Sequence, residues 1–507
     1  MSLFLAICLF SVAVSVQSWG TGGSMSTLRS PVTRSLRHGN MNMRWGLKGA
    51  GQSNKPMGDL EEGQTLRDTV PFELRGFSLP AVVFSVGVLL TGSSFAETFN
   101  AALKRAYETN PELNAERESI NISEQELKVS ISSYLPTITL EGTKSEEDTE
   151  KLTNTDGSNA SITDVDPSTR SLKITQTLID FGRGAELAKS KIGIDLAKAK
   201  LLKKEQEILY KAAEAYTGLI SAKEKFTINN SNVNLLERQV ETDKIRLERG
   251  QITLSDVAQS ESSFAEAQAK LIQAENDLLT SRLNYENVIG QLNDIESLDK
   301  SSVNDLDLPS QLSEAIEISK DKNPDLLISK FEYEQAKKDT ISAKSDLAPS
   351  AELSFDRSTT DDLSSTYDER EKDVLKATVT WPFFSGGKNY ANLNKNRSTE
   401  TQKSLLLDNS IKKNQTDVAS AWSTYQSNKS LLNSVRAQVD AAEIANEGIV
   451  AEYNSGSNRT TLEVIQSNSL LLNAQISLAD SEKNYILSQF NLLKSIGLLN
   501  SEYLKIR

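Results

Sequence analysis

An internal repeat constrains this chain more than any other feature of its sequence. A pattern that begins at Asn110 returns at Asn323, 213 positions later, with its landmarks in the same order. Because a repeated sequence folds into a repeated structural unit, we expect one architecture built twice in tandem. The matched landmarks are Asn110-Pro111-Glu112-Leu113 with Asn323-Pro324-Asp325-Leu326, Leu135-Pro136 with Ala348-Pro349, Phe181-Gly182-Arg183-Gly184 with Ser385-Gly386-Gly387-Lys388, Gly250 with Gly456, and Val257 with Val464.

Each copy predicts the same elements: a helix interrupted by Asn-Pro, two strands, a very long helix, a glycine-marked turn and another helix. We predict a first repeat over 97–300, a second over 301–500 and a short tail over 501–507. The long helix of the first copy is expected from about Gly184 to Glu248, close to about 100 Å at about 1.5 Å per residue. Its apolar residues at helical spacing predict lengthwise packing against other helices, as in a coiled coil. They are Ile208, Ala212, Ala215, Tyr216 and Leu219.

Four segments alternate apolar and polar residues with the period of two that is typical of a β-strand. One apolar face and one polar face suit a strand of an outer-membrane barrel, although a soluble sheet with one wet face gives the same pattern. Polar loops are expected at about 146–170 and 357–371. The apolar members are Ile138 and Leu140; Leu172, Ile174 and Leu178; Ala351, Leu353 and Phe355; and Leu375, Ala377, Val379, Trp381 and Phe383.

Four strands are too few to close a barrel around water, and an open sheet would leave two unpaired edges in lipid. If the sheet lies in a membrane, the chain must therefore oligomerise. Three copies would give twelve strands and twelve helical columns. Aromatic residues where strands meet helices fit an interfacial girdle in contact with outer-membrane lipid. They are Phe181, Trp381, Phe383 and Phe384.

Residues 1–96 are interpreted as a leader. Residues 75–96 have a basic start, an apolar run and small residues before Glu97, which is the pattern of a secretory signal peptide. The alternative is a single membrane anchor, although the apolar run is short for a bilayer span. The only cysteine, Cys8, and the only histidine, His38, lie in this leader. Its removal would exclude disulfides, Cys or His metal sites and Cys- or His-based catalysis. An all-carboxylate metal site or a Ser–Lys pair stays open on these grounds. We expect no enzyme, no metal and no cofactor.

The charge of the chain argues against one class of partner. Its formal net charge is -13, and no basic stripe is present that would follow a phosphate backbone. No nucleic-acid partner is expected.

These features together resemble the TolC family of outer-membrane efflux proteins. The resemblance covers nearly all of 97–500. It implies a mostly α fold with membrane β: a trimer with a 12-stranded β-barrel continuous with a 12-helix α-barrel that crosses the periplasm of a Gram-negative bacterium. It also implies a passive channel-tunnel for type I secretion or multidrug efflux. The implied partners are a periplasmic adaptor and an inner-membrane transporter of the ABC or RND type.

By the same resemblance, the function is concentrated in two helix tips, residues 247–257 and 453–466. Asp256 would contact Arg459 and, with Ser255 and Tyr453, hold the periplasmic entrance shut. A few charge-assisted hydrogen bonds would stabilise that closed state, and a competing partner would shift the population.

Other tip residues have roles implied by the family pattern. Glu463 would form a cation-selecting ring around the threefold axis, and Gln466 would make the next ring uncharged. Gly250 and Gly456 would form left-handed turns where an adaptor docks.

Alternatives remain at this stage. Asp256 and Glu463 could act only at helix starts, with Ser255 or Thr461 as the capping residue. The whole chain could be a periplasmic adaptor or a structural coiled-coil protein of the envelope. An adaptor would need one helical hairpin rather than two, and a coiled coil would not need four amphipathic strands.

Overall fold

The computed structural model describes residues 97–148, 150–151, 153–159, 165–292, 294–300, 306–364, 367–455 and 459–506. The predicted signal peptide at 75–96, Cys8, His38 and Gly456 lie outside the described residues. All structural statements below concern the described part of the chain.

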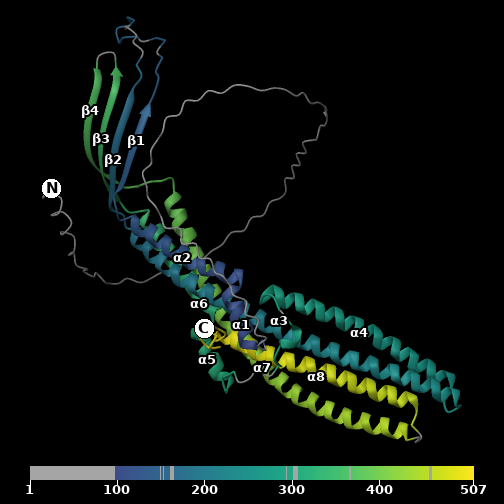
Figure 1. Cartoon of the computed structure of the whole chain (residues 1–507). Helices are drawn as coiled ribbons and strands as arrows, with labels where there is room; N and C mark the ends of the chain where they lie inside the picture. Colours follow the sequence, from purple (N-terminus) through teal and green to yellow (C-terminus); the bar gives the residue numbers. More distant parts are fainter. Residues whose placement is uncertain are drawn as a thin grey trace, which may run out of the picture. The chain divides into compact units, whose positions relative to one another are not determined.

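The order of elements runs twice through the same series (Figure 1). Helix, helix, strand, strand, long helix and helix are followed by the same six types of element in the second half. The first series is α1 (Phe99–Thr109), α2 (Pro111–Ser132), β1 (Thr137–Lys144), β2 (Ser168–Ile179), α3 (Arg183–Glu248) and α4 (Leu254–Val288). The second is α5 (Leu312–Lys322), α6 (Pro324–Ser345), β3 (Ser350–Ser364), β4 (Tyr367–Thr380), α7 (Lys388–Asn454) and α8 (Thr461–Ile496), with the short 3₁₀ helix η1 (Ile295–Ser297) between the two.

The two Asn-Pro dipeptides break their helices in the same way. Asn110 has φ -64° and ψ 122°, and its side chain accepts hydrogen bonds from the backbone N–H groups of Glu112 and Leu113. Asn323 repeats this geometry at φ -67° and ψ 121°. The following proline needs no N–H partner and holds a helical φ, so each dipeptide ends one helix and starts the next.

The long helices run without interruption. The predicted helix from about Gly184 to Glu248 is confirmed as α3, which has 66 residues, and α7 has 67. The five apolar residues predicted to pack lengthwise are all buried. Helix α3 packs against α4 of its own repeat and against α6 and α8 of the other, so the two hairpins lie side by side (Figure 1). None of the described helices is both long and apolar enough to span a bilayer.

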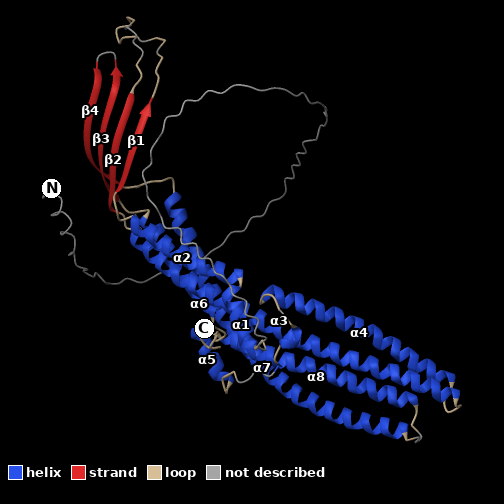
Figure 2. Cartoon of the chain, viewed as in Figure 1, coloured by secondary structure: helices blue, strands red, loops and turns tan. Residues whose placement is uncertain are grey.

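The strands form one antiparallel sheet in the order β1-β2-β3-β4 (Figure 2). One prediction was wrong here: the expected loop at 357–371 is largely strand, because β3 continues to Ser364 and β4 begins at Tyr367. The start of β2 at Ser168 likewise shortens the loop expected at 146–170. The ladder is made by backbone groups, and polar side chains in this stretch pair across it, as Arg357 does with Asp373 at 3.8 Å.

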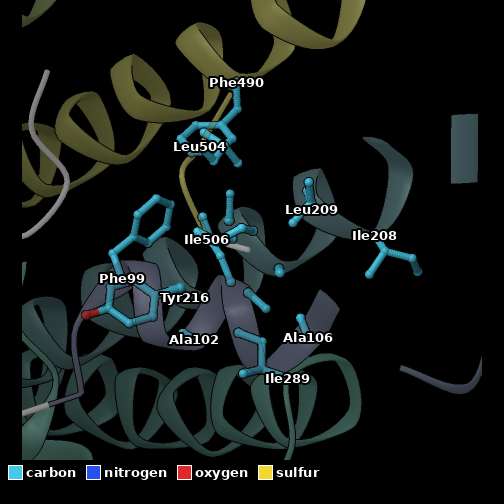
Figure 3. Close-up of a cluster of buried hydrophobic side chains, with 14 of the residues drawn as sticks. Phe99, Ala102, Ala106, Ile208, Leu209, Tyr216, Ile289, Phe490, Leu504 and Ile506 are labelled. Atoms are coloured by element: carbon cyan, nitrogen blue, oxygen red, sulfur yellow. The ribbon is translucent and has the colours of Figure 1, made fainter. Parts of the chain in front are cut away.

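The largest core lies where the short helix α1 packs against α3 (Figure 3). The Phe99 ring meets the rings of Tyr216 and Phe490 edge to face, at centroid distances of 5.1 and 5.4 Å. The Tyr216 hydroxyl donates to the backbone carbonyl groups of Glu97 and Asp299, at 2.8 and 2.9 Å. Because Phe490 belongs to α8, this cluster joins the two repeats.

Candidate functional site: the helix tips

Both helical hairpins turn sharply at the predicted tips. In the first, Gly250 has φ 71°, the left-handed conformation expected of it, and a Cβ added there would meet nothing within 4 Å. The glycine is therefore required by the backbone angle and not by crowding. Its counterpart Gly456 lies outside the described residues.

Each tip restarts its helix with a capping box, a reciprocal pair of hydrogen bonds. The Thr253 N–H donates to Asp256 Oδ2 at 2.9 Å, and the Asp256 N–H donates to Thr253 Oγ1 at 3.3 Å. Thr460 and Glu463 repeat the arrangement at 2.8 and 3.3 Å. The expected capping residues Ser255 and Thr461 were wrong, because each helix begins earlier than assumed and they lie inside its first turn.

The capping boxes also influence ionisation. The Thr253 backbone N–H and then its hydroxyl lower the pKa of Asp256 below its ordinary value. For Glu463, the Thr460 backbone N–H is the largest cause of a lowered pKa, followed by Arg459. Both carboxylates are therefore ionised at neutral pH, as a helix N-terminus favours.

Arg459 is held by acids of its own tip. Its Nε donates to Glu452 Oε2 at 2.6 Å, and its Nη1 donates to Glu463 Oε1 at 3.1 Å. In the described part of a single chain no ion pair joins Arg459 to Asp256. The predicted Asp256–Arg459 contact is thus not made within the chain, because each residue has local partners, and it remains a prediction between chains.

Tyr453 is the best connected of the predicted gate residues. Its hydroxyl donates to Asp243 Oδ1 at 2.9 Å and lies 2.9 Å from Thr461 Oγ1. The Arg246 guanidinium lies 4.1 Å from the centre of its ring. Burial and, with a smaller effect, Asp243 raise the pKa of Tyr453. The hydroxyl therefore stays protonated as a donor.

A comparison of the whole sequence with known families decides the identity. A profile described as "Outer membrane efflux protein" matches residues 102–291 and 315–498, which together make up most of the chain. The chain belongs to the outer membrane efflux protein family. It is an outer-membrane export channel of a Gram-negative cell, with its helical tunnel in the periplasm. This decides against a periplasmic adaptor and against a structural coiled coil.

Individual relatives agree with the family match. The outer membrane efflux protein BepC of Brucella suis is 26% identical over 434 residues, covering 84% of this chain and 91% of BepC. The outer membrane protein TolC of Escherichia coli is 21% identical over 439 residues, covering 82% and 86%. The alkaline protease secretion protein AprF of Pseudomonas aeruginosa is 21% identical over 349 residues, covering 68% and 72%.

Solved structures show the same fold. The Campylobacter jejuni CmeC outer membrane channel aligns with TM-score 0.71 at 15% identity, covering 85% of this chain and 98% of that one. The open-state MtrE channel of Neisseria gonorrhoeae aligns with TM-score 0.64 at 16% identity, covering 80% and 90%.

The remaining predicted residues of this efflux protein lie on its surface. Ser255 and Gln466 are exposed, and the Glu463 side chain is 38% exposed. The four proposed girdle aromatics are all exposed, between 62% and 85%. The side chains at the helix tips and at the proposed girdle are therefore accessible to lipid, water or another copy of the chain.

Sequence reasoning missed Asp243, which joins all four tip helices of this efflux protein. This α3 carboxylate is fully buried and accepts from Tyr453 of α7, from Ser260 Oγ of α4 at 2.6 Å and from Gln239 Nε2 at 2.9 Å. Thr461 of α8 reaches it through the Tyr453 hydroxyl. The helical spacing of Asp243 could have indicated its role. The buried residues Leu236, Val240 and Asp243 lie on one stripe of α3, and an acid in a buried stripe needs hydrogen-bond partners.

Proposed function

We propose that three copies of this chain form one export duct that is closed at its helix tips until partners open it. The observation that carries the proposal is the open sheet. In the described residues β1 and β4 each have one unpaired edge, while Ile138, Leu140 and Leu375 expose their side chains on the sheet. Unpaired backbone groups are too costly in lipid, and pairing β4 of one copy with β1 of the next satisfies them.

The helices support the same closure. Within the chain, α3 packs against α2 and α4 of its own repeat and against α6 and α8 of the other. Helix α7 packs against α6 and α8. Helices α2, α4 and α7 are thus the outer columns of one copy. Each has exposed apolar residues that a neighbouring copy would cover. These are Ile122, Val129, Ile272, Leu279, Leu283, Leu405, Leu406, Leu431 and Ile444.

The gate combines contacts within and between copies. Within a copy, Tyr453 and Asp243 tie the two hairpins together at the tip. Between copies, Asp256 and Arg459 pair when the entrance closes, with Ser255 alongside. A small number of charge-assisted bonds lets a partner shift the closed population without unfolding the helices.

The Glu463 side chain of each copy would supply charge to the lumen. Its Oε2 atom accepts from Thr460 in the capping box and its Oε1 atom accepts from Arg459, yet the side chain remains partly exposed. Three copies around a threefold axis would attract cations, and the neighbouring Gln466 ring would be neutral.

The duct performs no chemistry of its own and depends on partners. We propose a periplasmic adaptor docking near the turns at Gly250 and Gly456, and an inner-membrane ABC or RND-type transporter that supplies energy. Named relatives include an efflux protein, BepC, and a protease secretion protein, AprF, so both small solutes and proteins are candidate cargo classes.

Single-channel recording tests the proposal. The protein is purified from outer membranes and placed in a planar bilayer with a salt gradient. We expect small, long-lived, cation-preferring currents that increase when Asp256 or Arg459 is replaced by Ala. Arg397→Ala, an exposed position near the start of α7 and far from the tip, is the matched control. A chain that remains a soluble monomer, or that never conducts in any variant, would contradict the proposal.

A further inference from the structure

The exposed apolar face of the sheet changes character along its strands. Directly paired residues share a face, so Ile138, Ile174, Phe355 and Leu375 form one row across the four strands. The next row toward the hairpin ends contains Leu140, Leu172, Arg357 and Asp373. The row after that contains Gly142, Arg170, Thr359 and Glu371. An apolar surface is therefore bordered by two arginines.

A hollow lies at this border. It is an open groove of about 390 Å³. Leu140 and Leu172 supply apolar walls, and Arg170 and Arg357 supply charge. A Cβ at Gly142 would meet nothing within 4 Å, so the missing side chain leaves space in the groove.

The two arginines keep most of their hydrogen-bonding capacity. Arg170 Nη2 contacts Asp361 Oδ2 at 3.3 Å, and Arg357 Nε lies 3.8 Å from Asp373 Oδ1. Their side chains are 75% and 58% exposed. A guanidinium has five N–H donors in a planar fork that suits phosphate oxygens, and one weak contact leaves several of them free.

The groove lies in the outer part of the apolar band. From Asp373 to Trp381 the chain advances about 26 Å at about 3.3 Å per residue, which the tilt of about 40° of barrel strands reduces to about 20 Å of an apolar band about 25 Å tall. Trp381 follows β4 on the side of the periplasmic helices, so Arg170 and Arg357 lie toward the outer leaflet. Charged residues facing lipid cost little at the interface but much more at the midplane.

We propose that this groove binds a phosphorylated lipid of the outer leaflet. Arg170 and Arg357 hold a headgroup phosphate, and an acyl chain lies over Leu140 and Leu172 toward Ile174. Basic pockets beside apolar membrane surfaces recognise anionic headgroups in this way. The acids Asp373 and Glu371 belong to β4, two strands away from Arg170. Asp361 of β3 contacts Arg170 from the side of the hairpin ends, so the phosphate would approach the two arginines from the side of Leu140 and Leu172.

The apolar walls of the groove favour a lipid over free phosphate as its ligand. The position of the groove on the face of the sheet favours a lipid over a second copy of this chain. A neighbouring copy pairs through the strand edge, in the plane of the sheet, and leaves the face open. The proposal depends on the outer-membrane location and not on the gate.

Equilibrium binding tests it. The full chain, in an uncharged detergent, is titrated with a fluorescent diphosphorylated lipid A and with the same glycolipid lacking phosphates. We expect Arg170→Gln and Arg357→Gln each to weaken binding of the phosphorylated lipid about tenfold, and binding of the other lipid little. Arg370→Gln is the matched control, because Arg370 pairs with Thr360 on the opposite face of the sheet.

A second variant separates the groove from general charge attraction. Gly142→Leu fills the space while both arginines remain, and we expect it to weaken binding of the phosphorylated lipid as well. Equal weakening by Arg370→Gln, equal binding of both lipids, or full competition by inorganic phosphate at the lipid's own concentration would each overturn the proposal. Single-channel currents of the same variants should be unchanged, which separates this site from the gate.

Discussion

The two helix tips begin from the same local design and end with different contacts. Thr253 with Asp256 and Thr460 with Glu463 form capping boxes of almost identical geometry. Within the described part of the chain, the Asp256 carboxylate at the first tip accepts hydrogen bonds from Thr253 alone, whereas Glu463 at the second tip also accepts one from Arg459. The shared part starts a helix in each repeat. The part that differs, Arg459 with Tyr453 and its acceptor Asp243, ties helices together and is where a gate can be built.

The largest effect is expected from the contact that joins the tips. Asp243→Ala leaves the Tyr453, Ser260 and Gln239 donors without their buried acceptor, each unsatisfied group costing about 1–3 kcal/mol. We expect a loss of about 3 kcal/mol in the free energy of unfolding and larger single-channel currents. Asp243→Asn, which keeps an acceptor, should lose less. Denaturant unfolding and bilayer recording measure both quantities.

The control for this prediction is Asp277→Ala. Asp277 is an exposed acid on α4 that accepts a local hydrogen bond from Gln273. Tyr453→Phe should fall between the two, because it removes only the hydroxyl and keeps the ring under Arg246. Equal stability of Asp243→Ala and Asp277→Ala would show that the buried network does not hold the tips.

The capping boxes should lose equal amounts when broken. Thr253→Ala and Thr460→Ala each remove one side-chain acceptor from a helix N-terminus, at about 1 kcal/mol. We expect matching decreases in the free energy of unfolding from the two variants. Thr416→Ala, in the exposed middle of α7, is the matched control. A much larger loss at Thr460 would mean that capping and gating are not separate functions.

A smaller effect is expected from the pair proposed between copies. Asp256→Ala and Arg459→Ala each raise conductance, and in a double-mutant cycle we expect a coupling of about 0.5 kcal/mol or more in the closed-to-open equilibrium. The reason is that either single substitution already removes a direct Asp256–Arg459 pair, so the second substitution cannot remove it again and the two effects do not add. Strictly additive effects would mean that Arg459 acts through Glu452 and Glu463 alone.

The smallest effect is the pH dependence shared by both tips. The pKa values of Asp256 and Glu463 are lowered from 3.8 and 4.5 in the folded protein. Their contribution to stability is therefore complete above about pH 4.5 and is lost as the pH falls through the folded values. Asp256→Asn with Glu463→Gln should lower the melting temperature at pH 7, and the difference from the unchanged protein should decrease in scans at progressively lower pH, as both carboxylates become protonated. A difference that is independent of pH would contradict the prediction.

The sequence was sufficient for the architecture. The repeat from Asn110 to Asn323, the apolar stripe of α3 and the alternating strands are local or periodic signals, and each of them predicted its element. The sequence was not sufficient at 357–371, where a run of polar residues predicted a loop. Residues 357–364 and 367–371 are strand, because the backbone ladder accepts polar side chains that pair across it.

What only the tertiary structure decided is which side chains meet. Asp243 and Tyr453 are 210 positions apart and belong to different repeats, so no local pattern links them. Arg459 had a distant acid as its predicted partner, but Glu452 and Glu463 reach it within one tip. The periodic burial of a helix or strand is determined by its own residues, whereas a hydrogen bond between helices depends on how their faces are aligned after packing.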